Sequence, residues 1–379
     1  MRVALLTNIV PPYRVPVYRA LADTPDWRLR VFTNAATEFD RSWQVDAADL
    51  DVECVPSFSL VRGHRTLHIP WALPPALLRF RPQVLISTEL GARSLLAFAY
   101  GALARVPLVS WIETTPERVA DGGALRRWLH PWLLARAAAV LGPGSAARQV
   151  ARSFGVPDPR IVDAPNAHDS ESFEKRLAAL DRDAVARDLR AGLGTRSRIA
   201  LVVGRLFDVK GVRPLLEAWD HVPSSLRRDW TLLFVGSGPL AGEIARARDT
   251  HQRAEIVHVP AVQPADVVPF YAAADLLVFP SLGDVWGFAV NEAMACGLPV
   301  LCSTRAGCAA DLIRPGDNGW LADPRNRAAF AAALGDAMSC GRRRALGAAA
   351  RESVATFTPA ATAAGVRRAV AQALLPASE

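Results

Sequence analysis

The chain has 379 residues, of which 51% are hydrophobic and 21% charged, and its formal net charge is +7. This length and apolar content exclude a single small module and favour two domains, each with its own core. The positive charge is spread along the chain without the cluster typical of a nucleic-acid surface, so we expect no nucleic-acid partner; an anionic ligand and an anionic membrane surface both fit.

The first residues, MRVALLTNIVPP (1–12), combine one arginine with a short apolar run that ends in two prolines. The run is too short for a secretory signal, so we expect it to form the first strand. A membrane span is not expected, because even the apolar segment 94–111 is interrupted by Arg105 and Pro107. The five cysteines are scattered without a CxxC pair, which favours a reducing compartment. We expect a cytoplasmic protein, either soluble or peripheral at the inner membrane face.

In the first half of the chain, short apolar runs alternate with segments of helical periodicity. Strands are predicted at 3–8, 29–34, 83–88, 107–112 and 138–143. Helices are predicted near 15–23, 70–79, 91–104, 124–137 and 145–154. The alternation indicates a parallel sheet with crossover helices.

The second half repeats this alternation. Strands are predicted at 199–204, 231–236, 255–260, 275–280 and 299–303. Helices are predicted near 211–221, 239–250, 264–273, 288–296 and 324–338. The fold class is therefore α/β, with two doubly wound domains joined near the charged segment 172–198 and a cleft between them as the expected site. A last helix follows Thr358, which is a candidate N-cap.

The strand at 199–204 runs into GRLFDVKG (204–211), which carries two cations near the start of the next helix. Arg205 and Lys210, together with backbone amides at a helix N-terminus, provide what a diphosphate group needs. The chain otherwise uses arginine almost throughout, so the compact ammonium of Lys210 is noteworthy. A solvated loop with surface charges is the alternative interpretation, and the retained lysine favours the diphosphate site.

The next strand ends in GSGPL (236–240). Gly236 and Gly238 allow either the close approach of a ligand to the backbone or simply a tight turn between strand and helix. The third glycine of GxGxxG is absent, and no acidic residue ends the strand at 255–260. The segment therefore excludes the dinucleotide fingerprint and leaves both interpretations open.

A third candidate site lies in GDVWGFAVNEAMACGLPV (283–300), an apolar segment with two acids. Phe288 should begin a helix whose apolar face includes Glu292, and a carboxylate buried in this way needs a hydrogen-bond donor or a cation. Asp284 precedes the helix, where an ordinary N-terminal acid is the alternative. A sugar ligand meets the needs of both acids, with a ribose diol for one and a hexose hydroxyl for the other.

The run GRLFDVKG…GSGPL…YAAADLLVFPS…DVWGFAVNEAMACGLPV resembles the retaining family-4 glycosyltransferases of the GT-B type, which have two Rossmann-like domains. The resemblance is specific over 199–323 and looser before it, where PNAHDSESF (165–173) is similar to the family's Asn-x-x-Asp-x-x-x-Phe segment. It implies an acceptor-binding domain over 1–180, a nucleotide-sugar-binding domain over 181–357, and a helix over 358–379 that crosses back to the first domain.

By this resemblance, Arg205 and Lys210 would act in catalysis by holding the donor diphosphate. Glu292 would bind the ribose of the nucleotide, and Asp284 a hydroxyl of the transferred sugar. The other donor-binding positions implied are backbone groups at Gly287, Phe288, Ala289, Gly236 and Gly238. The family's motif usually starts with Glu, whereas Asp284 is one methylene shorter, which either alters the donor sugar accepted or shifts the backbone.

The first domain departs from the family in two places. Many relatives have a His after the fourth strand, near the anomeric centre of the sugar, whereas PLVSWIETT (107–115) offers Glu113 as the candidate catalytic group. Glu89 is a second acid at the neighbouring strand end, and helix capping is an equally good interpretation of each. The family's glycine pair after the first strand is replaced by prolines, which leaves Arg14 as a candidate anion contact on the acceptor side.

The resemblance implies transfer of a hexose from a nucleoside-diphosphate sugar, UDP-sugar first and GDP-sugar next, without a cofactor. The acceptor would be a lipid-linked sugar or a small natural product, in the synthesis of cell-surface polysaccharide, glycolipid or a glycosylated natural product. The segment 123–140, with Trp128 and Trp132 among arginines, is either an interfacial helix or an ordinary crossover helix. A nucleotide-sugar epimerase of the same fold and a non-catalytic nucleotide-sugar-binding homologue remain alternative functions.

Two patterns that imitate metal sites are set aside. The sequence DRD (181–183) matches the Asp-x-Asp of metal-dependent transferases, but it lies in a charged helical segment rather than at a strand end. His64, His68 and His130 lack the spacing of metal ligands. We expect no metal ion.

Overall fold

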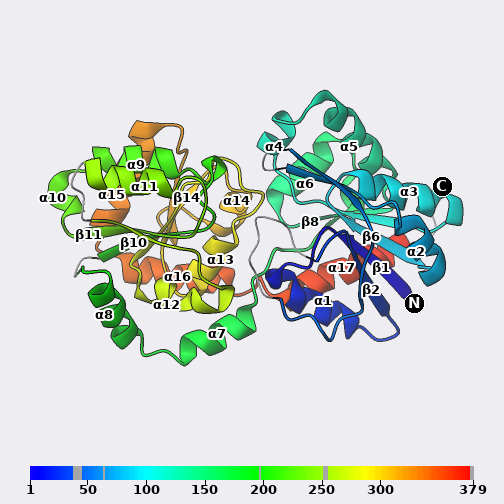
Figure 1. Cartoon of the computed structure of the whole chain (residues 1–379), viewed down its shortest axis with the longest axis horizontal. Coiled ribbons are helices and arrows are strands. Elements are labelled where there is room, and N and C mark those ends of the chain that lie inside the picture. The colour runs from blue at the N-terminus through cyan, green and yellow to red at the C-terminus, as the bar shows by residue number, and fades with distance from the viewer. Residues whose placement is uncertain (37–44, 63–64, 196–197, 251–254, 376–379) are drawn as a thin grey trace. The chain divides into compact units, whose positions relative to one another are not determined.

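The computed structural model describes residues 1–36, 45–62, 65–195, 198–250 and 255–375. The chain divides into two compact units: residues 1–167 together with the segment from Thr358 onward, and residues 168–357. Each unit contains a parallel sheet with helices on both faces (Figure 1). The predicted class, two doubly wound α/β domains, is confirmed.

The first unit is built on a seven-stranded sheet with the order β3-β2-β1-β6-β7-β8-β9. Its strands are β1 (Arg2–Thr7), β2 (Arg28–Thr33), β3 (Val52–Cys54), β6 (Val84–Thr88), β7 (Leu108–Trp111), β8 (Ala139–Gly142) and β9 (Ile161–Asp163). Neighbouring strands run parallel, with β1 between β2 and β6. A separate antiparallel pair is formed by β4 (Phe58–Arg62) and β5 (Arg65–Ile69).

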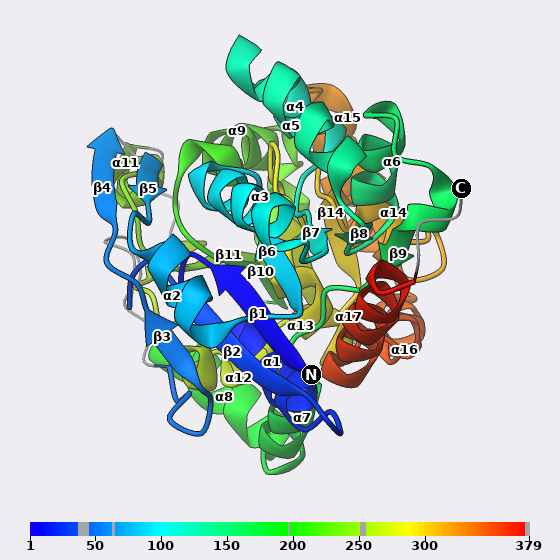
Figure 2. The ribbon, with the colours of Figure 1, turned by 90° about the vertical axis from the view of Figure 1, so that its right-hand side faces the viewer.

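Helices cover both faces of this sheet. They are α1 (Val15–Ala22), α2 (Leu73–Phe80), α3 (Ala92–Ala104), α4 (Pro116–Ala120), α5 (Ala124–Arg136), α6 (Ser145–Ser153) and α17 (Pro359–Ala373), with 3-10 turns η1 (Pro12–Arg14) and η2 (Asp158–Arg160). Side chains alternate along a strand, so Leu5 of β1 packs in one core layer with α1 and α17, and Leu6 packs in the other with α2. The two layers can be followed in Figure 2.

The C-terminal segment belongs to the first unit. Thr358 caps α17 by accepting a hydrogen bond from the backbone N–H of Ala361 at 3.2 Å. Apolar residues of α17 are buried in the core that includes β1 and β7, and the hydroxyl of Thr362 donates a 2.5 Å hydrogen bond to the carbonyl of Pro165. This helix therefore completes one face of the sheet and also holds the chain just before the second unit.

The second unit has a six-stranded sheet with the order β12-β11-β10-β13-β14-β15. Its strands are β10 (Arg198–Val203), β11 (Trp230–Val235), β12 (Ile256–Val259), β13 (Leu276–Phe279), β14 (Val300–Ser303) and β15 (Gly319–Ala322). All neighbouring strands are parallel. The order reverses at β10, which lies between β11 and β13.

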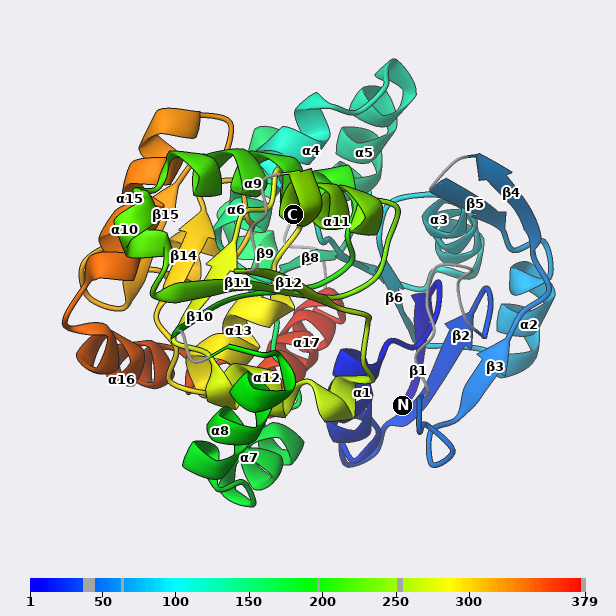
Figure 3. The ribbon, with the colours of Figure 1, turned by 60° about the vertical axis from the view of Figure 1, so that its left-hand side comes forward.

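Helices again form two layers, visible in Figure 3 above and below the sheet. One layer contains α9 (Val212–His221), α11 (Ala241–Thr250) and α15 (Arg327–Ser339), and the other contains α12 (Val268–Ala273), α13 (Phe288–Ala295) and α16 (Arg343–Val354). The remaining elements are α7 (Ser170–Ala178), α8 (Arg182–Gly192), α10 (Ser224–Arg227), α14 (Ala309–Leu312), η3 (Asp208–Lys210) and η4 (Pro264–Asp266).

The second compact unit begins at His168, whereas the sequence placed the domain boundary at residue 181. The helix α7 packs against α12 and α13, and Phe173 and Leu177 are buried in the core of the second unit. Burial of these two side chains, rather than the charged composition of 172–198, decides where the unit starts. Residues 196–197 of that segment lie outside the described residues.

Candidate active site

The carboxyl edge of the second sheet brings together the segments that follow β10 and β13. These strands are neighbours at the point where the strand order reverses, which is where ligands of open α/β sheets bind. The loop after β13 is fastened to the loop after β10, because the carbonyl of Val209 accepts hydrogen bonds from the Leu282 amide at 2.8 Å and the Ser281 hydroxyl at 3.0 Å. The segments of two predicted sites therefore lie side by side.

This fastening places Lys210 against Asp284. The ammonium of Lys210 forms an ion pair with the Asp284 carboxylate and lies 5.6 Å from the centroid of the Phe279 ring. Both side chains retain some exposure, 24% for the lysine and 15% for the aspartate, so a ligand can still reach them. The pair supplies one fixed positive charge and one hydroxyl acceptor side by side.

Arg205 lies on the same loop after β10 and is half-buried. Its guanidinium carbon is 5.2 Å from the centroid of the Phe207 ring, which holds the side chain against the loop. Two of the chain's cations thus belong to the segment between β10 and α9.

Gly236 and Gly238 are explained by close packing between loops. A side-chain carbon at Gly236 would overlap the carbonyl oxygen of Gly204, and one at Gly238 would lie 2.5 Å from the carbonyl oxygen of Leu206. The carbonyl of Gly236 is hydrogen-bonded to Nε2 of His258 at 2.8 Å. These glycines therefore allow close packing against the loop after β10, and their contact with a ligand stays a prediction.

The turn before α13 requires glycine at position 287. Gly287 has φ 121°, and a side-chain carbon there would lie 2.9 Å from the Phe279 ring. The turn is tied to a following segment through the Gly307 amide, which donates to the carbonyl of Asp284 at 3.0 Å. The helix α13 begins at Phe288, directly after this turn, and the N-terminal end of a helix favours negative charge.

Glu292 lies in the second turn of α13 and is hydrogen-bonded to Tyr271. The Tyr271 hydroxyl donates to Oε2 of Glu292 at 2.7 Å. Burial raises the pKa of the Glu292 carboxyl to about 7, and the hydrogen bond from Tyr271 opposes this rise. The expected partner of the buried acid is therefore a tyrosine of α12, which the sequence did not identify because it is 21 residues away and on another helix.

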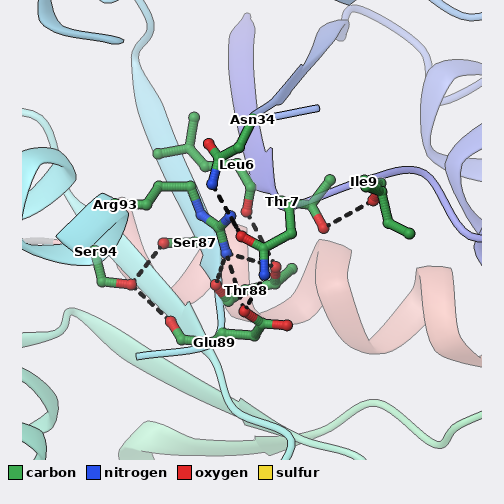
Figure 4. A network of polar contacts seen from close by, with 10 residues as sticks. Leu6, Thr7, Ile9, Asn34, Ser87, Thr88, Glu89, Arg93 and Ser94 are labelled. Carbon is green, nitrogen blue, oxygen red and sulfur yellow. Dashed lines mark hydrogen bonds and ion pairs between the residues drawn. The ribbon is translucent and has the colours of Figure 1, made fainter. Parts of the chain in front are cut away.

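In the first unit, Glu89 is held at the end of β6 by a network of polar side chains (Figure 4). Its carboxylate accepts a 2.6 Å hydrogen bond from the Asn8 amide and lies 3.8 Å from the guanidinium of Arg93. Arg93 is buried and donates to the Thr88 carbonyl and to Oδ1 of Asn8, which also accepts from Asn34. Glu89 itself is 59% exposed, so its outer face is open to a ligand.

Arg14 and Glu113 are brought together at the neighbouring strand end. Nη2 of Arg14 forms an ion pair with Oε1 of Glu113 and donates a 2.6 Å hydrogen bond to Oδ1 of Asn166. The Arg14 side chain is only 6% exposed, and burial lowers the pKa of its guanidinium. Arg14 is therefore paired and almost fully buried within the unit, and its contact with an anionic ligand stays a prediction.

The three motif residues of the segment PNAHDSESF (165–173) have three different structural roles. Asn166 accepts the hydrogen bond from Arg14. Asp169 caps α7 by accepting from the Ser172 amide at 3.2 Å. Phe173 packs in the core of the second unit, with its ring centroid 5.3 Å from that of His168 and 6.1 Å from that of Tyr271.

The helix α5 is partly a crossover helix and partly exposed. Leu133 and Leu134 are buried, and the ring of Trp132 packs edge-on against Phe98 of α3 at 4.8 Å. Trp128 is 66% exposed and stacks on Trp132 at 6.5 Å. The helix therefore packs as a crossover helix with one exposed tryptophan, and its interfacial role stays a prediction. No helix among the described residues is both long enough and apolar enough to span a bilayer.

The residues of the patterns that imitate metal sites have ordinary structural roles in the described parts of the chain. Asp181 caps α8 by accepting from the Ala184 amide at 3.0 Å. His64 lies outside the described residues. In the described parts of the chain, no three His, Cys, Asp or Glu side chains are grouped so that they could hold a metal ion.

Two family models match the chain, one for each unit. The model described as "Glycosyl transferase 4-like domain" matches residues 12–167, and the model described as "Glycosyl transferases group 1" matches residues 188–353. Among curated proteins, a D-inositol 3-phosphate glycosyltransferase of Acidothermus cellulolyticus is 30% identical over 210 residues, which are 53% of this chain and 45% of that protein. An O-antigen chain mannosyltransferase B of Escherichia coli is 30% identical over 135 residues, 35% of each chain. The chain thus matches about half or less of the length of these relatives.

Solved structures resemble the whole chain. Anabaena Alr3699/HepE in complex with UDP has a TM-score of 0.75 and 17% identity, covering 98% of this chain and 100% of that chain. Sucrose-phosphate synthase from Thermosynechococcus elongatus has a TM-score of 0.72 and 20% identity, covering 98% of both chains. At these identities the likeness shows the fold.

Proposed function

The chain belongs to the family-4 glycosyltransferases of the GT-B type, and on this premise we propose that it moves a hexose from a nucleoside-diphosphate sugar to an acceptor hydroxyl with retention of anomeric configuration. The observation that carries the proposal is the contact between Lys210 and Asp284 at the switch point of the second sheet. A cation, a hydroxyl acceptor and the N-terminus of α13 meet there, which is the set of groups that a sugar diphosphate requires.

Each donor group has a counterpart in this site. The diphosphate is bound by Lys210, Arg205 and the first amides of α13, the transferred sugar gives a hydroxyl to Asp284, and the ribose gives hydroxyls to Glu292. Lys210 is already paired with Asp284, so the incoming phosphate competes for the ammonium and frees the carboxylate to accept from the sugar. Binding of the diphosphate and orientation of the sugar are therefore coupled.

The reaction needs no covalent intermediate on the protein. The acceptor oxygen forms a bond to the anomeric carbon on the face from which the diphosphate leaves, the bond between that carbon and the phosphate oxygen breaks, and the acceptor proton passes to the leaving oxygen. The protein contributes positive charge at the leaving group and alignment of the two substrates. We propose that neither a metal ion nor another cofactor takes part.

UDP-sugar is the first donor to test and GDP-sugar the second. The solved relative with UDP supports this order through its fold and bound nucleotide. For the acceptor we propose a hydroxyl of a lipid-linked sugar or a small natural product. The exposed Trp128 and the basic charge of the chain support a peripheral contact of α5 with an anionic membrane, which flotation with anionic vesicles would test.

Thermal-shift measurements with UDP, GDP, dTDP, ADP and their sugars identify the donor, because a ligand that binds only the native state raises its melting temperature. The stabilising nucleotide sugar is then incubated with sugar and lipid acceptors, and the product linkage is read by NMR. A retained linkage, formed at the same rate in the presence of a metal chelator, is the expected result. Conversion of the nucleotide sugar alone to an epimer, or binding without turnover, would replace the proposal with an epimerase or a non-catalytic binding protein.

A further inference from the structure

Arg14 is built into the first unit as an internal partner of Glu113. It ends the 3-10 turn η1, which begins at the second of the two prolines after β1, and its amide donates a hydrogen bond to the Pro11 carbonyl at 2.9 Å. This rigid turn directs the side chain inward, where the guanidinium carbon lies 4.4 Å from the centroid of the buried Trp111 ring. The position is thus set by backbone constraint and by stacking before any ligand arrives.

The contacts of Arg14 neutralise it within the unit. Nη2 of Arg14 donates hydrogen bonds to both Glu113 and Asn166, and Asn166 is fully buried. Nη1 has no hydrogen-bond partner among the described residues, and it is shielded from solvent, so a ligand cannot reach it. A buried guanidinium is costly unless a carboxylate compensates it, and Glu113 is that carboxylate.

Glu113 is the exposed member of this group. It lies just beyond β7 at the carboxyl edge of the sheet, and its side chain is 23% exposed while that of Arg14 is 6% exposed. Arg14 engages Oε1, and in the described structure no hydrogen bond reaches Oε2. The ion pair therefore fixes one carboxylate oxygen and leaves the other available.

We propose that Arg14, with Asn166, is a positioning residue that orients Glu113, and that Glu113 accepts a hydrogen bond from an uncharged sugar or polyol hydroxyl bound at the carboxyl edge of the first unit. The inference rests on the proposed transferase function and names the chemistry of its acceptor side. A phosphate or carboxylate at this point would meet the negative charge of Glu113 with no accessible guanidinium to offset it. A hydroxyl, in contrast, donates directly to the free oxygen.

The test uses the full chain and begins with binding. Saturation-transfer NMR measures contact with a panel of pyranoses and myo-inositol, and separately inorganic phosphate is titrated as the anionic probe. Polyol signals should be present in the wild type and strongly reduced in Glu113→Gln and Arg14→Met, while phosphate binding should not change in either variant. Absence of polyol binding in the wild type, or unchanged binding in Glu113→Gln, would overturn the proposal.

A double-mutant cycle then tests whether Arg14 acts through Glu113. With the donor found by thermal shift, Arg14→Met and Glu113→Gln should each lower kcat/KM for the acceptor about 10- to 100-fold, as expected for a hydrogen bond to a charged group, and leave the donor KM unchanged. The double variant should be no slower than the worse single variant. Losses that multiply, or an equal rise in the donor KM, would refute the positioning role.

Arg30 offers a matched control in the same unit. It also pairs with a carboxylate, Asp51, at 2.9 Å and also lies over an aromatic ring, Phe80, at 5.1 Å. Arg30→Met should keep wild-type polyol binding and kinetics. Arg14→Lys keeps the charge and the folded unit if Arg14→Met does not fold, and it should recover part of the activity.

The two hypotheses fail in distinguishable ways. A wild-type chain that binds polyols through Glu113 but transfers no sugar would remove the transferase function and leave this site. Normal sugar transfer by Glu113→Gln would remove this inference and leave the transferase function.

Discussion

Nucleotide binding to the second unit is expected to depend on the ionisation of Glu292. Burial raises the pKa of this carboxyl to about 7, against 4.5 for an ordinary glutamate. Ribose hydroxyls donate hydrogen bonds to a carboxylate, so the ionised form is the one that binds. As pH falls below 7 the apparent Kd for UDP should rise about tenfold per pH unit, or about 30-fold between pH 8 and pH 5.5.

Calorimetric titration of UDP from pH 5.5 to pH 8 measures this effect, and two variants isolate it. Glu292→Gln is neutral at every pH, so any pH dependence that it retains comes from the phosphates of UDP and can be subtracted. Tyr271→Phe removes the hydrogen bond that favours the ionised carboxylate, so the pKa of Glu292 should rise further and the midpoint of the binding curve should move to higher pH.

Two results would refute this reasoning. If wild type and Glu292→Gln follow the same pH profile, Glu292 does not exchange a proton when UDP binds. If the midpoint moves to lower pH in Tyr271→Phe, the Tyr271 hydroxyl does not stabilise the ionised form, and the 2.7 Å contact has another role.

The remaining predictions concern charge, backbone conformation and capping. Lys210→Ala should lower kcat about 100-fold, because a preorganised charge on the leaving group is worth roughly 3 kcal/mol. Lys175→Ala removes the chain's other lysine, from an exposed helix position, and should leave kcat unchanged. Near-normal turnover of Lys210→Ala would contradict the assignment. Gly287→Ala should destabilise the second unit and weaken UDP binding, whereas Gly335→Ala, in open space on a helix, should maintain or raise the melting temperature. Thr358→Ala should cost about 1 kcal/mol of unfolding free energy in a denaturant titration, and an unchanged transition would show that the cap does not contribute.

Local signals in the sequence were sufficient to predict the strand and helix that frame the proposed donor site. The apolar run before Gly204 and the helix that starts at Phe288 are encoded within a few residues each, and the structure has β10 and α13 there. Asp284 and Glu292 lie on one continuous segment, a loop followed by α13. The sequence alone therefore placed Asp284 in the loop and Glu292 in the second turn of the helix. Short strands such as β9 and β15 were missed, because three or four residues carry little periodicity and pair only at a sheet edge that already exists.

The sequence by itself determined the fold class, and it predicted the donor motif and the requirement that Glu292 have a partner. Only the tertiary structure decided which partners were chosen: Tyr271 for Glu292, Asp284 for Lys210, and Glu113 with Asn166 for Arg14. The physical reason is that the local sequence pattern around a buried charge indicates that the charge needs a compensating group. The compensating group itself comes from a distant segment, which only the packing of the sheet and helices brings within hydrogen-bonding distance. Arg14 shows this most clearly, since its sequence context indicated an anion contact and the fold gave it an internal carboxylate.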